Sequence, residues 1–343
     1  MKKVLIIGNY GAGNLGDEAI LSGLVTLCTK NNLQPKVISA NPAETTRLHN
    51  VPAVPPIPCG IRSFLRGTLS ATKRAYIECD AVVLGGGGLF TDERWQAPFI
   101  WGIHALGSKL SKKPLYCLGQ SVGPLRSKHS RKIAYHVFSH AKAICVRDAK
   151  SAKLLREIGI PENKIQIASD LALLLPSHQS VYDCHKKIII SLRHWFKKEK
   201  TILHTLAEVL PQFTHKVMLL PMGDRDLDLL LELKHKLKIP AEIIRPGTPA
   251  ELIRQLNNCS LAIGMRLHSL ILSSVQGIPC VGLSYSDKVK NFCAEAGIVH
   301  ANIAEITPKL LTELIAKAKY DAEKFAYLKN KTEQVLNSIL SQI

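Results

Sequence analysis

The sequence contains no apolar run long enough to cross a bilayer, so nothing in it predicts a membrane-spanning helix. Residues 4–7 imitate the start of a signal peptide, but this apolar run stops after four residues and no cleavage site follows. The nine cysteines form no CxxC pair, and Cys117 and Cys145 stand in apolar stretches, which is typical of reduced structural thiols. From these absences we expect a soluble, cytoplasmic protein.

The motifs of several protein classes are also missing. No GxxxxGK[ST] run is present, which excludes a P-loop nucleotide hydrolase, and no zinc-finger or RNP signature indicates nucleic acid as a partner. Asp224-Arg225-Asp226 has the letters of a metal-binding DxD motif, but its place after a predicted strand is more typical of an acidic helix start. We therefore predict no metal site.

Acidic residues are few beside basic ones. The chain has 27 Asp and Glu against 45 Lys and Arg, which gives a net charge of +18. A charge of this size requires an anionic partner, either an anionic substrate or an anionic membrane surface. A non-enzymatic basic module that binds nucleic acid or membrane would also explain the charge, but it leaves the glycine-rich segments described below unexplained.

What the chain does contain is a regular alternation of short Val-, Ile- and Leu-rich runs with segments of helical period, which indicates parallel strands with crossover helices. The predicted strands lie at residues 4–7, 36–39, 81–84, 114–118 and 143–146, and then at residues 187–192, 216–220, 241–244, 261–263 and 280–283.

The two halves of the chain begin alike, since MKKVLII at residues 1–7 is echoed by HKKIIIS at residues 185–191. A chain of 343 residues is also long enough for two cores. We predict an α/β protein whose two domains, residues 1–178 and 185–319, face each other across a cleft. A C-terminal helix at residues 320–343 is expected to pack back on the first domain.

Glycine-rich segments follow three of the predicted strands. Gly11-Ala12-Gly13-Asn14-Leu15-Gly16 has the letters of a dinucleotide motif, but Asp17 and Glu18 occupy the helix start where a pyrophosphate would have to bind. Gly85-Gly86-Gly87-Gly88 and Gly119-Gln120-Ser121-Val122-Gly123-Pro124 are predicted to be loops where a ligand approaches the backbone, with a tight structural turn as the alternative for the first.

Cationic residues follow three other predicted strands. Arg147 comes directly after residues 143–146, Arg266 and His268 after residues 261–263, and Lys288 after residues 280–283. In parallel α/β sheets ligands bind beyond the carboxyl ends of the strands, so these side chains would suit a small polyanion. The alternatives are a surface pair of Arg147 with its neighbour Asp148 and a structural histidine at position 268.

Together these motifs resemble the polysaccharide pyruvyl transferase family. The resemblance spans nearly the whole chain and rests on Gly8-Asn9-Tyr10-Gly11 through Gly16-Asp17-Glu18-Ala19-Ile20, Gly85–Gly88, Gly119–Pro124, Val146-Arg147-Asp148 and Gly264-Met265-Arg266-Leu267-His268-Ser269. The segment from Gly277 to Lys288 is similar to the bacterial cell-wall (CsaB-like) branch of the family.

The resemblance implies a GT-B-like architecture of two Rossmann-like domains. It also implies transfer of a pyruvyl group from phosphoenolpyruvate to a glycan as a cyclic ketal, with neither a cofactor nor a nucleotide. Arg147, Arg266 and Lys288 would bind the donor, and His268 would carry protons. The acceptor side would comprise Asn9, Asn14, Gly86, Gly87, Gln120 and Ser121, with Asp17 as a second catalytic residue.

Three points stay open on the sequence alone. Asp17, Asp92 and Glu93 all remain candidates for the general base. A GT-B glycosyltransferase or sugar epimerase that uses a nucleotide sugar shares the expected fold. Residues 61–74 and 193–198 combine basic with apolar side chains, which suggests peripheral contact with an anionic membrane. The contact would be with the inner face of the membrane, and it would suit a glycan acceptor that is lipid-linked.

Overall fold

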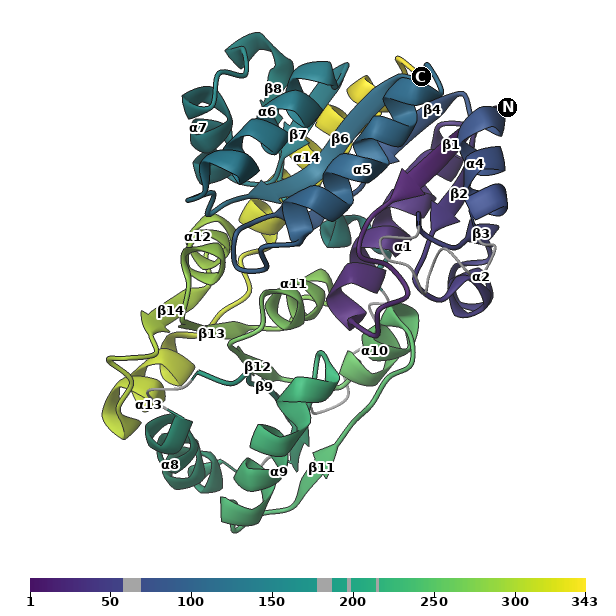
Figure 1. Cartoon of the computed structure of the whole chain (residues 1–343). Coiled ribbons are helices and arrows are strands. Elements are labelled where there is room, and N and C mark those ends of the chain that lie inside the picture. Colours follow the sequence, from purple (N-terminus) through teal and green to yellow (C-terminus); the bar gives the residue numbers. More distant parts are fainter. Residues whose placement is uncertain (58–68, 178–186, 196–198, 214–215) are drawn as a thin grey trace. The chain divides into compact units, whose positions relative to one another are not determined.

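The computed structural model describes residues 1–57, 69–177, 187–195, 199–213 and 216–343. The chain divides into two compact units, each a parallel sheet covered by helices (Figure 1). Unit 1 comprises Met1–Leu174 together with Lys329–Ile343, and unit 2 comprises Leu175–Leu328.

The sheet of unit 1 contains eight strands within the described residues, all of them paired in parallel, in the order β3-β2-β1-β4-β6-β7-β8, with β5 paired to β6. The strands are β1 (Lys2–Ile7), β2 (Leu33–Ile38), β3 (Ala53–Val54), β4 (Ala81–Leu84), β5 (Gly87–Phe90), β6 (Leu115–Val122), β7 (Ala143–Val146) and β8 (Ile165–Ile167). Because β1 lies between β2 and β4, the strand order reverses there, and such a reversal point is where open α/β sheets bind ligands.

Helices cover both faces of this sheet, since residues of β1 alternate between two cores: Leu5 and Ile7 belong to one, Val4 and Ile6 to the other. The first core is covered by α4 (Leu69–Glu78), α5 (Ala97–Leu110), α6 (Lys128–His140) and α7 (Ala149–Glu157). The second is covered by α1 (Leu15–Lys30) and by α14 (Ala322–Leu340), which lies behind the sheet in Figure 1; α2 (Pro42–His49) follows β2.

The C-terminal part of α14 is an integral part of unit 1. Leu336 and Ile339 are fully buried in its second core, and the amide of Ser169 donates to the Thr332 hydroxyl over 3.0 Å. The last fifteen residues of the chain therefore complete the N-terminal fold.

Unit 2 has the strand order β11-β10-β9-β12-β13-β14, again parallel, with its reversal point between β9 and β12. Its strands are β9 (Lys187–Ser191), β10 (Lys216–Leu219), β11 (Ala241–Ile243), β12 (Leu261–Gly264), β13 (Cys280–Ser284) and β14 (Val299–Asn302). One face packs on α8 (Glu199–Val209), α9 (Leu227–Lys236) and α13 (Pro308–Lys317), and the other carries α10 (Pro249–Leu256), α11 (Leu267–Val275) and α12 (Asp287–Ala296) (Figure 1).

All ten predicted strands are present, but four further strands, β3, β5, β8 and β14, were not predicted. The predicted loop at Gly119–Pro124 is wrong for most of its length, because β6 continues through Val122. The predicted loop at Gly85–Gly88 is likewise wrong at its second half, since β5 begins at Gly87.

The seven cysteines within the described residues are all buried and none forms a disulfide, whereas Cys59 and Cys184 lie outside those residues. Burial raises the pKa of Cys28 to about 12 and that of Cys145 to about 11, so these thiols stay protonated and unreactive. The expectation of structural thiols is confirmed for the described cysteines. No helix among the described residues is long and apolar enough to span a membrane.

Candidate functional site

The carboxyl-terminal edge of the unit 1 sheet gathers most of the predicted acceptor-side residues. Adjacent parallel strands end at the same edge, so the loop after β1, the glycines after β4, the end of β6 and the residue after β7 become neighbours. A Cβ atom added at Gly87 would lie 3.6 Å from Oδ1 of Asp17, which shows how closely the loop after β4 approaches the first turn of α1.

Asp17 is held in place by Asn9, whose Nδ2 donates to Oδ2 of Asp17 over 2.7 Å. Asn14 acts on the backbone instead, since its Oδ1 accepts from the amide of Gly16 at 3.0 Å and its side chain is the N-cap of α1. Of the two asparagines predicted to face an acceptor, Asn9 therefore orients a carboxylate and Asn14 starts a helix.

A buried network that sequence reasoning missed anchors the loop after β1. Oε1 of Glu18 accepts from the amide of Gly11 at 2.8 Å, and its Oε2 lies 2.7 Å from Nε2 of His49, whose Nδ1 is 3.1 Å from the Ser22 hydroxyl. Gly11 has a φ of 70°, which favours glycine. The network fixes the loop that carries Asn9 and Asn14.

Tyr10 belongs to the same loop and is fully buried, and its hydroxyl has no hydrogen-bond partner among the described residues. Burial, and after it the charges of Asp17 and Glu18, raise the pKa of Tyr10 well above its usual value. A Cβ atom added at Gly85 would overlap this hydroxyl, so Gly85 is required by packing.

This contact predicts a compensating pair of substitutions. Gly85→Ala should lower the free energy of unfolding by about 1–3 kcal/mol, because the new methyl group overlaps the Tyr10 hydroxyl. Tyr10→Phe removes an unpaired hydroxyl, should cost little alone, and should restore most of the loss in the double variant, since the next ring atom is 3.2 Å away. Denaturant unfolding of the four proteins measures the coupling, and additive effects would contradict the packing argument.

Gly86 also faces protein atoms. An added Cβ would meet Ile20 and Leu171 at 2.9 Å and the carbonyl oxygen of Gly119 at 3.1 Å. Close internal packing therefore requires a glycine at position 86. Gly87, with a φ of 104°, remains the glycine of this run that borders Asp17.

Gln120 and Ser121 are buried in β6, so the prediction that they stand in a loop is wrong. Nε2 of Gln120 donates to the carbonyl oxygens of Leu84 and Gly85, so it joins the ends of β4 and β6. The Ser121 hydroxyl donates to Oδ2 of Asp148 over 3.3 Å. Both side chains shape the edge of the sheet from inside.

Arg147 is the largest departure from expectation in unit 1. Its side chain is only 8% exposed, and Nη1 donates to Oδ2 of Asp170 over 2.7 Å, where Asp170 itself is buried. The neighbour Asp148 is the N-cap of α7 and accepts from the Ser151 amide at 2.7 Å. Arg147 therefore forms a buried ion pair with a residue that the sequence did not single out, and the surface pair with Asp148 is wrong.

Among the other candidate bases, Asp92 is engaged by backbone donors. Its Oδ2 accepts from the amides of Arg126 and Ser127. Burial tends to raise the pKa of Asp92, but hydrogen bonds from Ser130, Ser127 and Arg126 outweigh it and hold that pKa below its usual range. A lowered pKa makes the Asp92 carboxylate a weaker base, and Asp17 and the exposed Glu93 are the other candidates for the general base.

The carboxyl-terminal edge of the unit 2 sheet carries the cations. Arg266 follows β12, and its guanidinium forms a bidentate pair with the fully buried Asp226: Nε to Oδ2 at 2.8 Å and Nη2 to Oδ1 at 2.5 Å. Oδ2 of Asp226 also accepts from the Met222 amide at 3.2 Å. The pair uses two of the five N–H donors of a guanidinium and fixes the direction of the others.

His268 and Lys288 are each the second residue of a helix at this edge, in α11 and α12 respectively, and both side chains are half-buried. The strands before them, β12 and β13, are paired neighbours, so the two helix N-termini begin side by side. Helix N-termini attract anions. The structure thus places Arg266, His268 and Lys288 at one edge of one sheet, while Arg147 belongs to unit 1.

A fourth cation at this edge was not predicted as a site residue. Arg193 follows β9, its guanidinium lies 4.8 Å from the centre of the Tyr285 ring, and Nη1 donates to the Tyr285 hydroxyl at 2.6 Å. Trp195 packs against the same ring with 5.4 Å between ring centres. The sequence did contain a signal for Arg193. This residue follows β9, the first strand of the unit 2 sheet, at the point where the strand order reverses.

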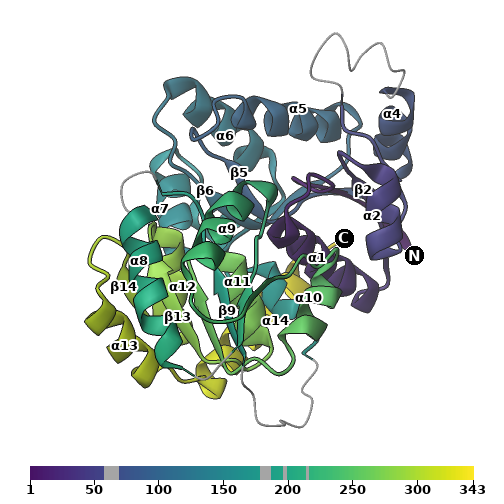
Figure 2. The ribbon, with the colours of Figure 1, turned by 90° about the horizontal axis from the view of Figure 1, so that it is seen from below.

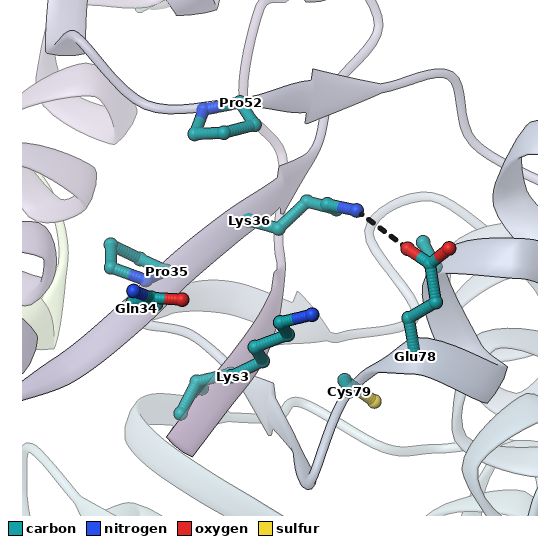
Figure 3. Close-up of a pocket in the computed structure, with 9 residues that line it drawn as sticks. Lys3, Gln34, Pro35, Lys36, Pro52, Glu78 and Cys79 are labelled. Carbon is teal, nitrogen blue, oxygen red and sulfur yellow. Dashed lines mark hydrogen bonds and ion pairs between the residues drawn. The ribbon is translucent and has the colours of Figure 1, made fainter. Parts of the chain in front are cut away.

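A hollow of about 200 Å³ lies elsewhere in unit 1, beside Lys3 at the start of β1, Lys36 of β2 and Glu78 at the end of α4 (Figure 3). Lys36 and Glu78 form an ion pair across it at 3.1 Å. No predicted site residue lines this hollow, and it is not at the carboxyl-terminal edge, so we do not assign it to the site.

A model of the polysaccharide pyruvyl transferase family matches residues 14–287. The amylovoran biosynthesis protein AmsJ of Erwinia amylovora is 25% identical over 364 aligned positions, which cover 86% of each chain.

Solved structures with this fold include UDP-GlcNAc 2-epimerase from Neisseria meningitidis bound to UDP-GlcNAc, with a TM-score of 0.68 at 12% identity over 98% of this chain and 99% of that one. HepE from Anabaena, in complex with UDP and glucose, has a TM-score of 0.62 at 12% identity over 100% of this chain and 98% of that one. These likenesses confirm the predicted α/β fold of two Rossmann-like domains of GT-B type.

Proposed function

Since the chain belongs to the polysaccharide pyruvyl transferase family, we propose that phosphoenolpyruvate is its donor and that two hydroxyls of one polysaccharide sugar receive the pyruvyl group as a cyclic ketal. The observation that most supports this donor is the cationic edge of the unit 2 sheet. Arg193, Arg266, His268 and Lys288 all follow strands β9, β12 and β13 at that edge.

The charge of the donor fits this edge. Phosphoenolpyruvate carries a carboxylate and a phosphate within a few bonds of each other, and it offers little apolar surface, so its binding depends on charge-assisted hydrogen bonds. Arg266 is well suited to this, because its pairing with Asp226 fixes the guanidinium before a ligand arrives. Lys288 at the start of α12 adds a point charge to the helix N-terminus.

The proposed reaction balances without an oxidant, a metal or a nucleotide. The methylene carbon of the donor gains a proton, the adjacent carbon becomes oxocarbenium-like, and a sugar hydroxyl attacks it and loses its proton. The C–O bond to phosphate then breaks, and a second hydroxyl of the same sugar attacks and loses its proton. Of the two protons lost by the hydroxyls, one replaces the proton given to the methylene carbon and the other is taken up by the departing phosphate. The products are the ketal and hydrogen phosphate.

The proton that adds to the methylene carbon and the protons that leave the hydroxyls need carriers. We assign the donor-side transfer to His268, which stands at a helix N-terminus beside Arg266. We assign a hydroxyl proton to Asp17, whose carboxylate is oriented by Asn9. We assign Arg147 no proton transfer, because its guanidinium forms a buried ion pair with Asp170 in unit 1.

The test is phosphate release from phosphoenolpyruvate, measured across a panel of free and lipid-linked glycans in the presence of EDTA. Thermal shifts with phosphoenolpyruvate and with UDP-GlcNAc separate this proposal from a nucleotide-sugar enzyme of the same fold. Stabilisation by UDP-GlcNAc alone, with no phosphate released on any glycan, would overturn the proposal.

Lys288 offers the cleanest test of donor binding. Lys288→Ala should weaken phosphoenolpyruvate binding by about 10- to 100-fold, because loss of a charge-assisted contact costs about 1.5–3 kcal/mol. Lys290→Ala, on the exposed side of the same helix, is the matched control and should leave the affinity unchanged. Titration calorimetry measures both, and equal affinities would remove Lys288 from the donor site. Arg147→Ala is unsuitable here, since it also leaves Asp170 buried without its cation.

A further inference from the structure

Helix α5 of unit 1 has its large apolar residues on the side that faces solvent. Its buried positions are occupied by small or polar residues such as Ala97, His104, Ala105 and Ser108. The exposed side carries Phe99 (47% exposed), Ile103 (40%), Leu106 (49%) and Leu110 (75%), and Trp95 (70%) lies just before the helix. The spacing of three to four residues places these four on one stripe about 16 Å long.

This orientation of α5 is fixed by its neighbours, so the stripe cannot turn inward. A Cβ atom at Gly102 would meet Ile133 of α6 at 2.8 Å, and one at Gly107 would meet the Tyr76 ring of α4 at 2.7 Å. The Tyr76 hydroxyl also donates to the carbonyl oxygen of His104 at 2.9 Å. Helix α5 is therefore clamped between α4 and α6, and Figure 2 shows the three helices along one margin of unit 1.

The chain segment that contains the stripe is strongly basic. From residue 94 to residue 147 the chain has no Asp or Glu, whereas it has ten Lys and Arg: Arg94, Lys109, Lys112, Lys113, Arg126, Lys128, Arg131, Lys132, Lys142 and Arg147. Apart from the buried Arg147 and the half-buried Lys113 these are exposed. This stretch alone contributes +10 to the net charge of +18.

We propose that the α5 stripe and the basic residues around it form a docking surface for an anionic lipid bilayer. Large apolar and aromatic side chains enter the interface between headgroups and acyl chains, and surrounding lysines and arginines bind the anionic headgroups. A second copy of the chain is a poorer occupant, because a twofold contact through α5 would bring two strongly basic segments together.

This surface differs from the two membrane segments suggested by the sequence. Most of residues 61–74 lies outside the described residues, and the remainder belongs to α4, next to α5. In the segment 193–198, Arg193 and Trp195 pack on Tyr285 at the edge of the other sheet.

Flotation of the full chain with vesicles tests the proposal. We expect binding to phosphatidylcholine vesicles that contain about 30% phosphatidylglycerol, weak binding to pure phosphatidylcholine, and a decrease above about 0.5 M salt. Phe99→Gln/Leu106→Gln should lower the partition coefficient at least about tenfold, because it removes the centre of the stripe. Leu231→Gln/Tyr327→Gln, which changes two exposed apolar residues on α9 and α14, should bind like the unchanged protein.

A second pair of variants, matched in charge change, tests the contribution of the basic residues to vesicle binding. Lys109→Gln/Lys112→Gln should weaken binding to the anionic vesicles, whereas Lys309→Gln/Lys317→Gln, equal in charge change but in unit 2, should not. Circular dichroism checks that each variant is folded. The proposal is overturned if the α5 double variant binds as well as the unchanged protein, or if neutral vesicles bind equally. It is also overturned if sedimentation shows a dimer that this variant converts to monomers.

Discussion

His268→Ala is expected to lower kcat by about 10²- to 10⁴-fold, the range that a positioned proton carrier contributes, while phosphoenolpyruvate affinity changes much less. The reason is that the residues at the carboxyl-terminal edge of the unit 2 sheet have different chemical roles. The guanidinium of Arg266 and the ammonium of Lys288 are suited to binding the anionic donor, whereas the imidazole of His268 at the start of α11 is a side chain that can both donate and accept a proton.

Steady-state phosphate release gives kcat, and titration calorimetry gives the donor affinity. His268→Gln keeps a hydrogen-bonding side chain without the proton exchange, so it should lose turnover as severely as the alanine variant. His235→Ala, an exposed histidine of α9 in the same unit, is the control and should retain full activity. If His268→Ala keeps most of its kcat, or loses donor binding in proportion, His268 is a structural or binding residue.

The sequence predicted the framework of the fold better than the internal partners of the site. Strands such as residues 81–84 and 143–146 were found because continuous Val, Ile and Ala runs are typical of buried parallel strands. The end of β6 and the start of β5 were missed because Gly119 and Gly87 have no side chain to show a strand pattern. The glycines at 86 and 119 are required by neighbours such as Leu171, which is far away in sequence.

Positions of the cations were predictable for a simple reason: residues that follow parallel strands reach the carboxyl-terminal edge. Their counter-ions were not. Asp170 lies 23 residues from Arg147, and Asp226 lies 40 residues from Arg266, with no pattern in the sequence that connects either pair. Only the strand order brings these carboxylates next to their arginines. For the same reason Arg147 was expected as an accessible cation, although Asp170 holds it in the interior.

The two aspartates of the Asp224-Arg225-Asp226 segment should differ sharply on substitution. Asp226→Ala removes the bidentate partner of Arg266 and leaves a largely buried guanidinium without its anion, which costs about 3 kcal/mol in comparable pairs. It also removes the acceptor of the Met222 amide. Asp224 is exposed, so Asp224→Ala should change the free energy of unfolding by less than about 0.5 kcal/mol.

Denaturant unfolding compares the two variants, and Asp226→Ala should also lose turnover because Arg266 is no longer held in place. Asp226→Asn separates shape from charge: it keeps one acceptor oxygen for the guanidinium, so it should be more stable than the alanine variant. A metal-binding DxD motif would give a different result, in which both alanine variants lose activity alike and a divalent ion raises the thermal stability of the unchanged protein. Equal destabilisation by both alanine variants would contradict the structural role of the Asp226–Arg266 pair, and with it the picture of Arg266 as a donor-binding residue fixed in advance.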